Sequence, residues 1–315
     1  MRRLKILMAA MMVLVLAQAI FSAPGDGKGK KKGTVPPPKF SKDVEGTFFN
    51  DAAAELLGDR PDFSKSGSTP GGTVDTPEEG GAAAGATYSW SKLISSDTLE
   101  NEIKKHVAAL APSMATPSKF GSAINETRNA YSVVATMFAV IASYDGEVRW
   151  KDSAAAMRDG VARAGFNCKV NTTASFNEAK GRYEELSELL SGNKPKLEDA
   201  PAEAEWSEVA DLTELMKRIE LANEKKLKPW STSKGDFTAN KDQYIHEAEI
   251  LAALAHVIPN DATYAGDEAF TAFANALKDG ALEMAQGAKS DNFEQAQAGS
   301  VQATKACDDC HGAYK

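Results

Sequence analysis

Three residues near the C-terminal end of the chain combine side chains that can hold a cofactor covalently. Cys307 and Cys310 are three residues apart, and His311 follows directly, in the stretch Cys-Asp-Asp-Cys-His. On a helix, residues i, i+3 and i+4 share one face, so two thiols and an imidazole would project in the same direction. Two thiols can add to the vinyl groups of a haem while the imidazole binds its iron, and CxxCH is the attachment pattern of c-type haem. We therefore predict one covalent haem c on Cys307 and Cys310, with His311 as the proximal iron ligand.

Other uses of two closely spaced cysteines fit the sequence less well. A redox-active pair of the thioredoxin type lies at a helix N-terminus, where the thiol pKa is lowered, whereas this pair closes a C-terminal helical pattern. A structural zinc site needs four ligands, and Cys168 is the only other cysteine. A simple disulfide would leave His311 without a role. Because Cys168 has no CxxC partner, we expect it to be a free thiol, with an intermolecular disulfide as the alternative.

The elements that must position this motif are predicted to be helices. From Tyr88 onward, apolar residues recur at steps of three and four, which is typical of amphipathic helices. In the last third of the chain this pattern predicts helices at about 204–227, 240–258, 266–287 and 291 to the end. Short connections with helix-breaking residues separate them. Four amphipathic helices joined in this way predict an antiparallel four-helix bundle over residues 196–315.

The preceding residues, 88–195, repeat this plan. Several residues recur 117 positions later, among them Leu110 and Leu227, Pro112 and Pro229, Phe120 and Phe237, and Phe176 and Phe293. Such an offset indicates a tandem duplication, so the predicted fold is all-α with two tandem four-helix bundles. At the same offset the first copy has Leu190, Asn193 and Lys194 in place of the two cysteines and the histidine. The first bundle is therefore predicted to be a haem-free, degenerate copy.

The N-terminal part of the chain resembles an export signal followed by a tether. Residues 1–19 combine a basic start, an apolar run over residues 6–16 and the small-x-small sequence Ala-Gln-Ala, which is the pattern of a cleaved secretory signal peptide. The run is short for a membrane span, which needs roughly 20 residues, so an uncleaved anchor is the alternative. Residues 20–87 are rich in Gly, Pro and Lys, and we expect a disordered, flexible linker. The predicted location is the periplasm, with no transmembrane span after cleavage.

Composition limits the partners and the chemistry. The formal net charge is −8 over 315 residues, which argues against nucleic acid, because phosphate binding needs clustered positive charge. The other histidines, His106, His246 and His256, are expected at the surface or in satisfied core positions. No general acid–base pair or activated nucleophile stands out, so we do not predict an enzyme.

The helical pattern, the export signal and the C-terminal position of the motif together resemble the class II cytochromes c, the cytochrome c prime family. The resemblance covers about residues 200–315 and includes the aromatic and basic residues after His311. It implies that the first helix of the bundle covers the haem face opposite His311. Met216, within Leu215–Ile219, falls where some members of that family carry a distal methionine ligand. The alternative for Met216 is core packing, because methionine fills bundle interiors readily.

The resemblance implies one-electron transfer through the haem to and from a redox partner protein, and it leaves a homodimer open. One alternative is binding of a diatomic gas such as NO or CO by a five-coordinate haem. A second alternative is a structural or scaffolding role in the cell envelope.

Overall fold

The computed structural model describes residues 89–314, and this part of the chain is helical, without a β-strand. The predicted signal peptide (1–19) and linker (20–87) lie outside the described residues. The first group of helices consists of α2 (Ser96–Leu110), α3 (Pro117–Ser122), α4 (Ile124–Ala142), α5 (Ala154–Asn167) and α6 (Thr173–Leu190). The second group consists of α7 (Trp206–Val209), α8 (Leu212–Ala222), a π-helical segment (Asn223–Leu227), α9 (Lys228–Trp230), α10 (Lys234–Ala239), α11 (Lys241–Val257), α12 (Glu268–Lys289) and α13 (Phe293–Tyr314).

Helix starts are set by short polar side chains that accept a hydrogen bond from a free backbone N–H, as helix capping requires. Asp267 accepts from the N–H of Phe270 at 3.0 Å and begins α12. Asp211 accepts from the N–H of Thr213 at 3.0 Å and begins α8. The second cap explains a difference from the sequence prediction: the segment expected as one helix over 204–227 is interrupted at Ala210, where the backbone is extended.

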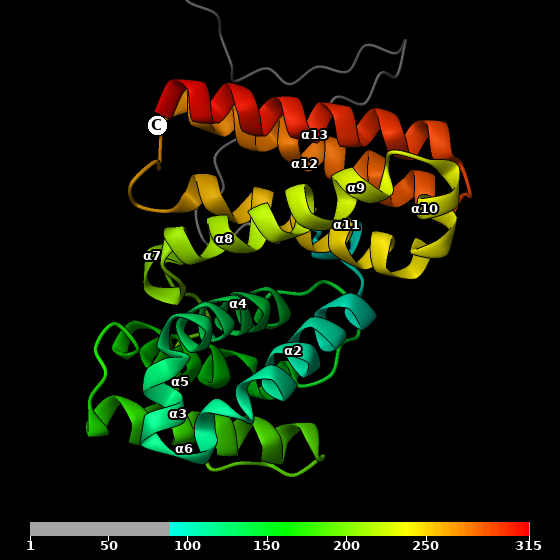
Figure 1. The fold of residues 1–315 in the computed structure, drawn as a ribbon. Coiled ribbons are helices and arrows are strands. Elements are labelled where there is room, and N and C mark those ends of the chain that lie inside the picture. The colour runs from blue at the N-terminus through cyan, green and yellow to red at the C-terminus, as the bar shows by residue number, and fades with distance from the viewer. Residues whose placement is uncertain (1–88, 315) are drawn as a thin grey trace, which may run out of the picture. The chain divides into compact units, whose positions relative to one another are not determined.

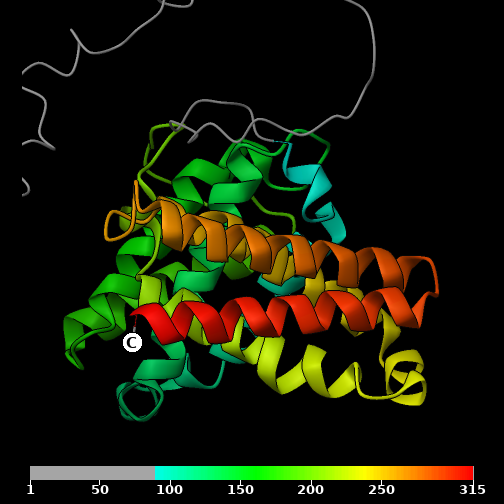
Figure 2. The same ribbon diagram turned by 90° about the horizontal axis from the view of Figure 1, so that it is seen from above.

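Within each group, successive long helices contact one another and the last contacts the beginning of the group. In the first group α2 contacts α4, α4 contacts α5, α5 contacts α6, and α6 returns to α2. In the second group α8 contacts α11, α11 contacts α12, α12 contacts α13, and α13 returns to the π-helical segment after α8. The long helices α12 and α13 run side by side along one edge of the molecule, as two views show (Figure 1 and Figure 2). Between the groups, α4 contacts α8 and α2 contacts α11.

The 117-residue offset recurs in the structure. Moving the bounds of α3 by 117 residues gives those of α10. The rings of Phe120 and Phe176 lie 5.7 Å apart, and those of Phe237 and Phe293 lie 5.5 Å apart. In both groups a buried tyrosine hydroxyl donates to the carbonyl of an alanine at equivalent positions, Ala179 and Ala296. The two groups therefore share helix order and core contacts as well as sequence spacing.

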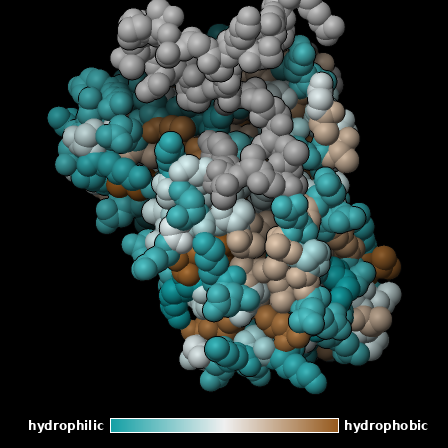
Figure 3. Space-filling model, turned by 180° about the vertical axis from the view of Figure 1, so that it is seen from behind, coloured by the Kyte–Doolittle hydropathy of each residue, from teal (hydrophilic) through white to brown (hydrophobic). Residues whose placement is uncertain are grey.

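The described surface is mainly polar. Hydrophilic side chains cover most of the face seen in Figure 3, with smaller hydrophobic groups between them. Among residues 89–314, the large apolar side chains classed as exposed are Val170, Leu221 and Val301. No helix in that range is both long enough and apolar enough to cross a bilayer.

Candidate functional site

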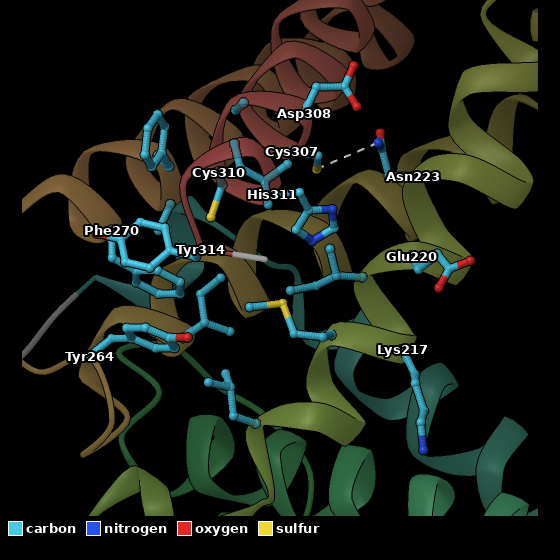
Figure 4. A pocket seen from close by; sticks show the side chains of 18 of the residues that line it. Lys217, Glu220, Asn223, Tyr264, Phe270, Cys307, Asp308, Cys310, His311 and Tyr314 are labelled. Carbon is cyan, nitrogen blue, oxygen red and sulfur yellow. Dashed lines mark hydrogen bonds between the residues drawn. The ribbon is translucent and has the colours of Figure 1, made fainter. Parts of the chain in front are cut away.

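A cavity of about 600 Å³ opens between α8, the start of α12 and the end of α13. Its wall contains all four residues predicted to bind the cofactor: Cys307, Cys310, His311 and Met216. The remaining lining side chains are mostly apolar or aromatic, and Figure 4 shows the labelled ones around the opening. Residues that lie about 90 positions apart in the sequence thus share one space.

The two cysteines project from the last turns of α13. Both are half-buried free thiols that line the cavity. Burial raises the pKa of Cys307 to about 11, helped by the nearby carboxylates of Glu224 and Asp308. Burial also raises the pKa of Cys310, with a contribution from Asp267. The thiols are therefore protonated at neutral pH, which is the opposite of the lowered pKa that a redox-active CxxC pair uses.

His311 projects from the end of α13 beside Cys307 in Figure 4 and lines the cavity. Its imidazole is exposed and makes no hydrogen bond or ion pair within residues 89–314. The ring nitrogens of an exposed imidazole can bind water or a ligand. The free ring nitrogens of His311 are available to a ligand in the cavity.

Helix α8 forms the wall that includes Met216. Leu212 and Ile219 accompany it, and all three line the cavity. Met216 is half-buried. Its thioether is a soft donor that suits a haem iron, and it is also a flexible packing group. Met216 and His311 line the same cavity.

Asn223 is a site residue that no sequence pattern revealed. It begins the π-helical segment that follows α8, and π-helical turns are often found at functional sites. The side chain is buried and its Nδ2 donates to Cys307 Sγ at 3.8 Å and to Glu224 Oε1 at 3.1 Å. Its Oδ1 has no partner within the described residues. No spacing in the sequence signals a π-helical turn, so this contact could not have been predicted.

An aromatic group closes the end of the cavity near the C-terminus. Tyr264 and Phe270 stack with centroids 4.0 Å apart, and the ring of Tyr314 meets each of them edge-on at 5.5 Å. The hydroxyl of Tyr314 donates to Asp267 at 2.7 Å, and this hydrogen bond raises the pKa of Tyr314 to about 12. Since Asp267 also caps α12, the contact fastens the last turn of α13 to the first turn of α12.

The other histidines and the third cysteine lie elsewhere. His106 and His246 each place Nε2 within 2.9 Å of a carboxylate oxygen of Glu102. His256 meets the ring of Trp90 edge-on at 5.1 Å. Cys168 is a buried free thiol at the end of α5, and burial raises its pKa to about 12. None of the four lines the cavity, and within residues 89–314 no group of three or more His, Cys, Asp or Glu is arranged to hold a metal ion.

Comparisons with protein-family models, with curated proteins and with solved structures each gave no match for this chain.

Proposed function

We propose that this protein is a c-type cytochrome with one haem, attached through thioether bonds to Cys307 and Cys310 and bound at iron by His311. The observation that carries the proposal is the cavity itself: both thiols of the CxxCH sequence and an imidazole without a partner line one space. The favoured function is one-electron transfer to and from a redox partner protein.

The donors and the lining fit a haem. A volume of about 600 Å³ lies within the roughly 300–1,000 Å³ typical of cofactor sites, which are mostly apolar with a few placed polar groups. The rings of Tyr264, Phe270 and Phe273 and the side chains of α8 supply the apolar wall. When bound, a haem would supply one-electron redox chemistry, and the iron ligands and the burial that the protein provides would set its potential.

Each residue has a defined role in this proposal. The thiols of Cys307 and Cys310 fix the porphyrin, the His311 imidazole supplies the proximal ligand, and Met216 is the proposed distal ligand. Asn223 orients the sulfur of Cys307, because its amide lies within hydrogen-bonding distance of that atom. A thioether on the second axial position would raise the potential and suit electron transfer.

We further propose that residues 88–195 and 196–315 form two tandem four-helix bundles. The second would resemble the class II cytochromes c, and the first would be a copy of it without haem. The ends of the last helices support this. α13 continues to Tyr314, but α6 stops at Leu190, and the chain then turns at Gly192, whose φ is +87°. Asn193 and Lys194, the counterparts of Cys310 and His311, thus lie beyond the helix. We also propose that the protein acts outside the cytoplasm, in the periplasm, because residues 1–19 have the sequence pattern of a secretory signal peptide.

Mass spectrometry of the denatured, purified protein tests the proposal. The wild-type chain, produced in a host that attaches haem to exported proteins, should carry the mass of one haem after denaturation. Replacing both Cys307→Ala and Cys310→Ala should remove it, while Cys168→Ala, a matched loss of one thiol, should leave it in place. A colourless wild-type protein with three titratable thiols would refute the assignment.

A further inference from the structure

The two sides of helix α8 lie in different environments. One side, with Leu212 and Met216, lines the cavity. The other side carries Glu214 and Arg218, each about 1% exposed. Two charged residues that are almost fully buried on an 11-residue helix are costly unless each is paired. Their partners show what holds the helix.

The guanidinium of Arg218 is paired across the boundary between the two helix groups. Its Nε lies 2.6 Å from Glu102 of α2, and its Nη1 lies 2.7 Å from Glu247 of α11. Glu102 is itself fully buried and is also approached by His106, His246 and Lys105. The first group thus supplies one of the two carboxylates that neutralise the buried cation on α8.

Glu214, like Arg218, is contacted by a residue of the first helix group. Nδ2 of Asn129 on α4 donates to the backbone carbonyl of Glu214 at 2.8 Å and lies 3.2 Å from its carboxylate. Arg128 donates to Asp211, the residue that caps α8, at 2.5 Å. Residues of the first group therefore contact α8 at three places. These are its N-cap, Asp211, then Glu214, two residues before Met216, and Arg218, two residues after it.

We propose that the haem-free half is a positioning element that fixes the wall of the cavity opposite His311. Glu102 and Asn129 are its main positioning residues, and they act through Arg218 and Glu214 on the residue between, Met216. This proposal rests on the proposed function. It gives the copy without cysteines a purpose, because α8 can offer one face to the cofactor only while its other face is held by the first half.

The test compares two variants of the full exported chain with wild type. Glu102→Gln removes the charge that faces Arg218 but keeps the shape of the side chain, and Asn129→Leu removes the amide at a half-buried site. Glu178→Gln is the charge-matched control, because Glu178 on α6 is paired with Arg163 and Arg182. Tyr131→Phe, which loses a buried hydrogen bond to Ala179 within the first half, controls for lost stability. The measurements are the carbon monoxide affinity of the ferrous protein and hydrogen exchange at residues 212–222.

If α8 is held less firmly, carbon monoxide should bind more readily. This is expected whether Met216 no longer binds the iron or no longer blocks access to it. We expect at least a tenfold rise in affinity for Glu102→Gln and Asn129→Leu, equivalent to about 1.4 kcal/mol, with faster exchange along α8 and unchanged haem mass. Both controls should stay within twofold of wild type. If wild type carries haem but the two variants also stay within twofold, the positioning role is wrong and the cytochrome assignment stands. If wild type carries no haem, the assignment itself is wrong.

Discussion

Two glycines in long helices should respond in opposite ways to the same substitution. Gly299 lies in α13 against α12, where an added Cβ would come within 2.5 Å of the carbonyl oxygen of Gly280 and 2.7 Å of the backbone nitrogen of Met284. Gly181 lies in α6, and nothing is within 4 Å of a Cβ added there. Both contacts at Gly299 are with backbone, which cannot rotate away as a side chain can. The helices α12 and α13 would have to separate.

The magnitude follows from two opposing contributions. Replacing glycine by alanine inside a helix stabilises by roughly 1 kcal/mol, because the unfolded chain has less freedom to lose. Overpacking costs about 1–3 kcal/mol, and two backbone contacts below 3.0 Å place Gly299→Ala at the upper end. We expect Gly299→Ala to lower the free energy of unfolding by about 2 kcal/mol and Gly181→Ala to raise it by about 1 kcal/mol.

Urea unfolding followed by far-ultraviolet circular dichroism measures both variants. With a slope of about 3 kcal/mol per molar urea, the Gly299→Ala midpoint should fall by about 0.7 M and that of Gly181→Ala should rise by about 0.3 M. Because α13 carries Cys307, Cys310 and His311, the absorption spectrum of the proposed haem should shift at the same lowered urea concentration, while the covalently attached haem stays on the chain. A Gly299→Ala protein as stable as wild type would show that α12 and α13 are not packed backbone to backbone.

Three further predictions concern the cavity, the buried charges and the first half. Met216→Ala should convert a low-spin ferrous haem to a high-spin one that binds carbon monoxide; if the wild type is already high-spin, Met216 is a packing residue and the gas-binding alternative gains. Burial alone would raise the pKa of Glu102, but hydrogen bonds from His106 and His246 and the charge of Arg218 outweigh it and lower that pKa strongly. The stability that Glu102 contributes is therefore present above the ordinary glutamate pKa of 4.5 and is lost as the pH falls below it, so urea midpoints should decline more steeply with acid in wild type than in Glu102→Gln. Replacing Leu190 and Asn193 by cysteine and Lys194 by histidine should still give one haem per chain by mass, because α6 ends at Leu190; a second haem would show that this end of the helix can extend.

The long helices could be predicted from the sequence because their apolar periodicity is strong and their ends carry short polar residues. The expected 240–258, 266–287 and 291-to-end segments correspond to α11, α12 and α13 with shifts of one or two residues at most ends. The prediction from apolar periodicity misses the break at Ala210, since the apolar stripe continues across it. The signal for a new helix is Asp211 followed three residues later by Glu214, and Asp211 accepts a hydrogen bond from the Thr213 N–H.

The candidate site, like the fold, has one part that the sequence predicts and another that it does not. The side on which Cys307, Cys310 and His311 project follows from their spacing alone, because three and four residues are nearly one turn of a helix. Contacts that depend on packing between distant segments carry no such pattern. The approach of Asn223 to Cys307 requires the π-helical turn after α8, and the hydrogen bond of Tyr314 to Asp267 joins residues 47 positions apart.

The two helix groups share one helix order, but their last two helices pack differently. In the second half, Gly280 and Gly299 let α12 and α13 meet at backbone distance. In the first half, Gly160 ends an Arg-Asp-Gly sequence that corresponds to the Lys-Asp-Gly sequence ending at Gly280, 120 positions later. The nearest atoms to a Cβ added at Gly160 belong to the side chain of Arg182, 3.1 Å away. A charged side chain thus stands between α5 and α6 where the second half has direct helix contact. Close packing of α13 on α12 leaves the face with the two thiols and the imidazole turned toward α8, and α8 is in turn held from behind by Glu102 and Asn129. The group that contains the CxxCH sequence is therefore the one whose last helix is long and packed at backbone distance, and in our proposal the other group supports the opposite wall.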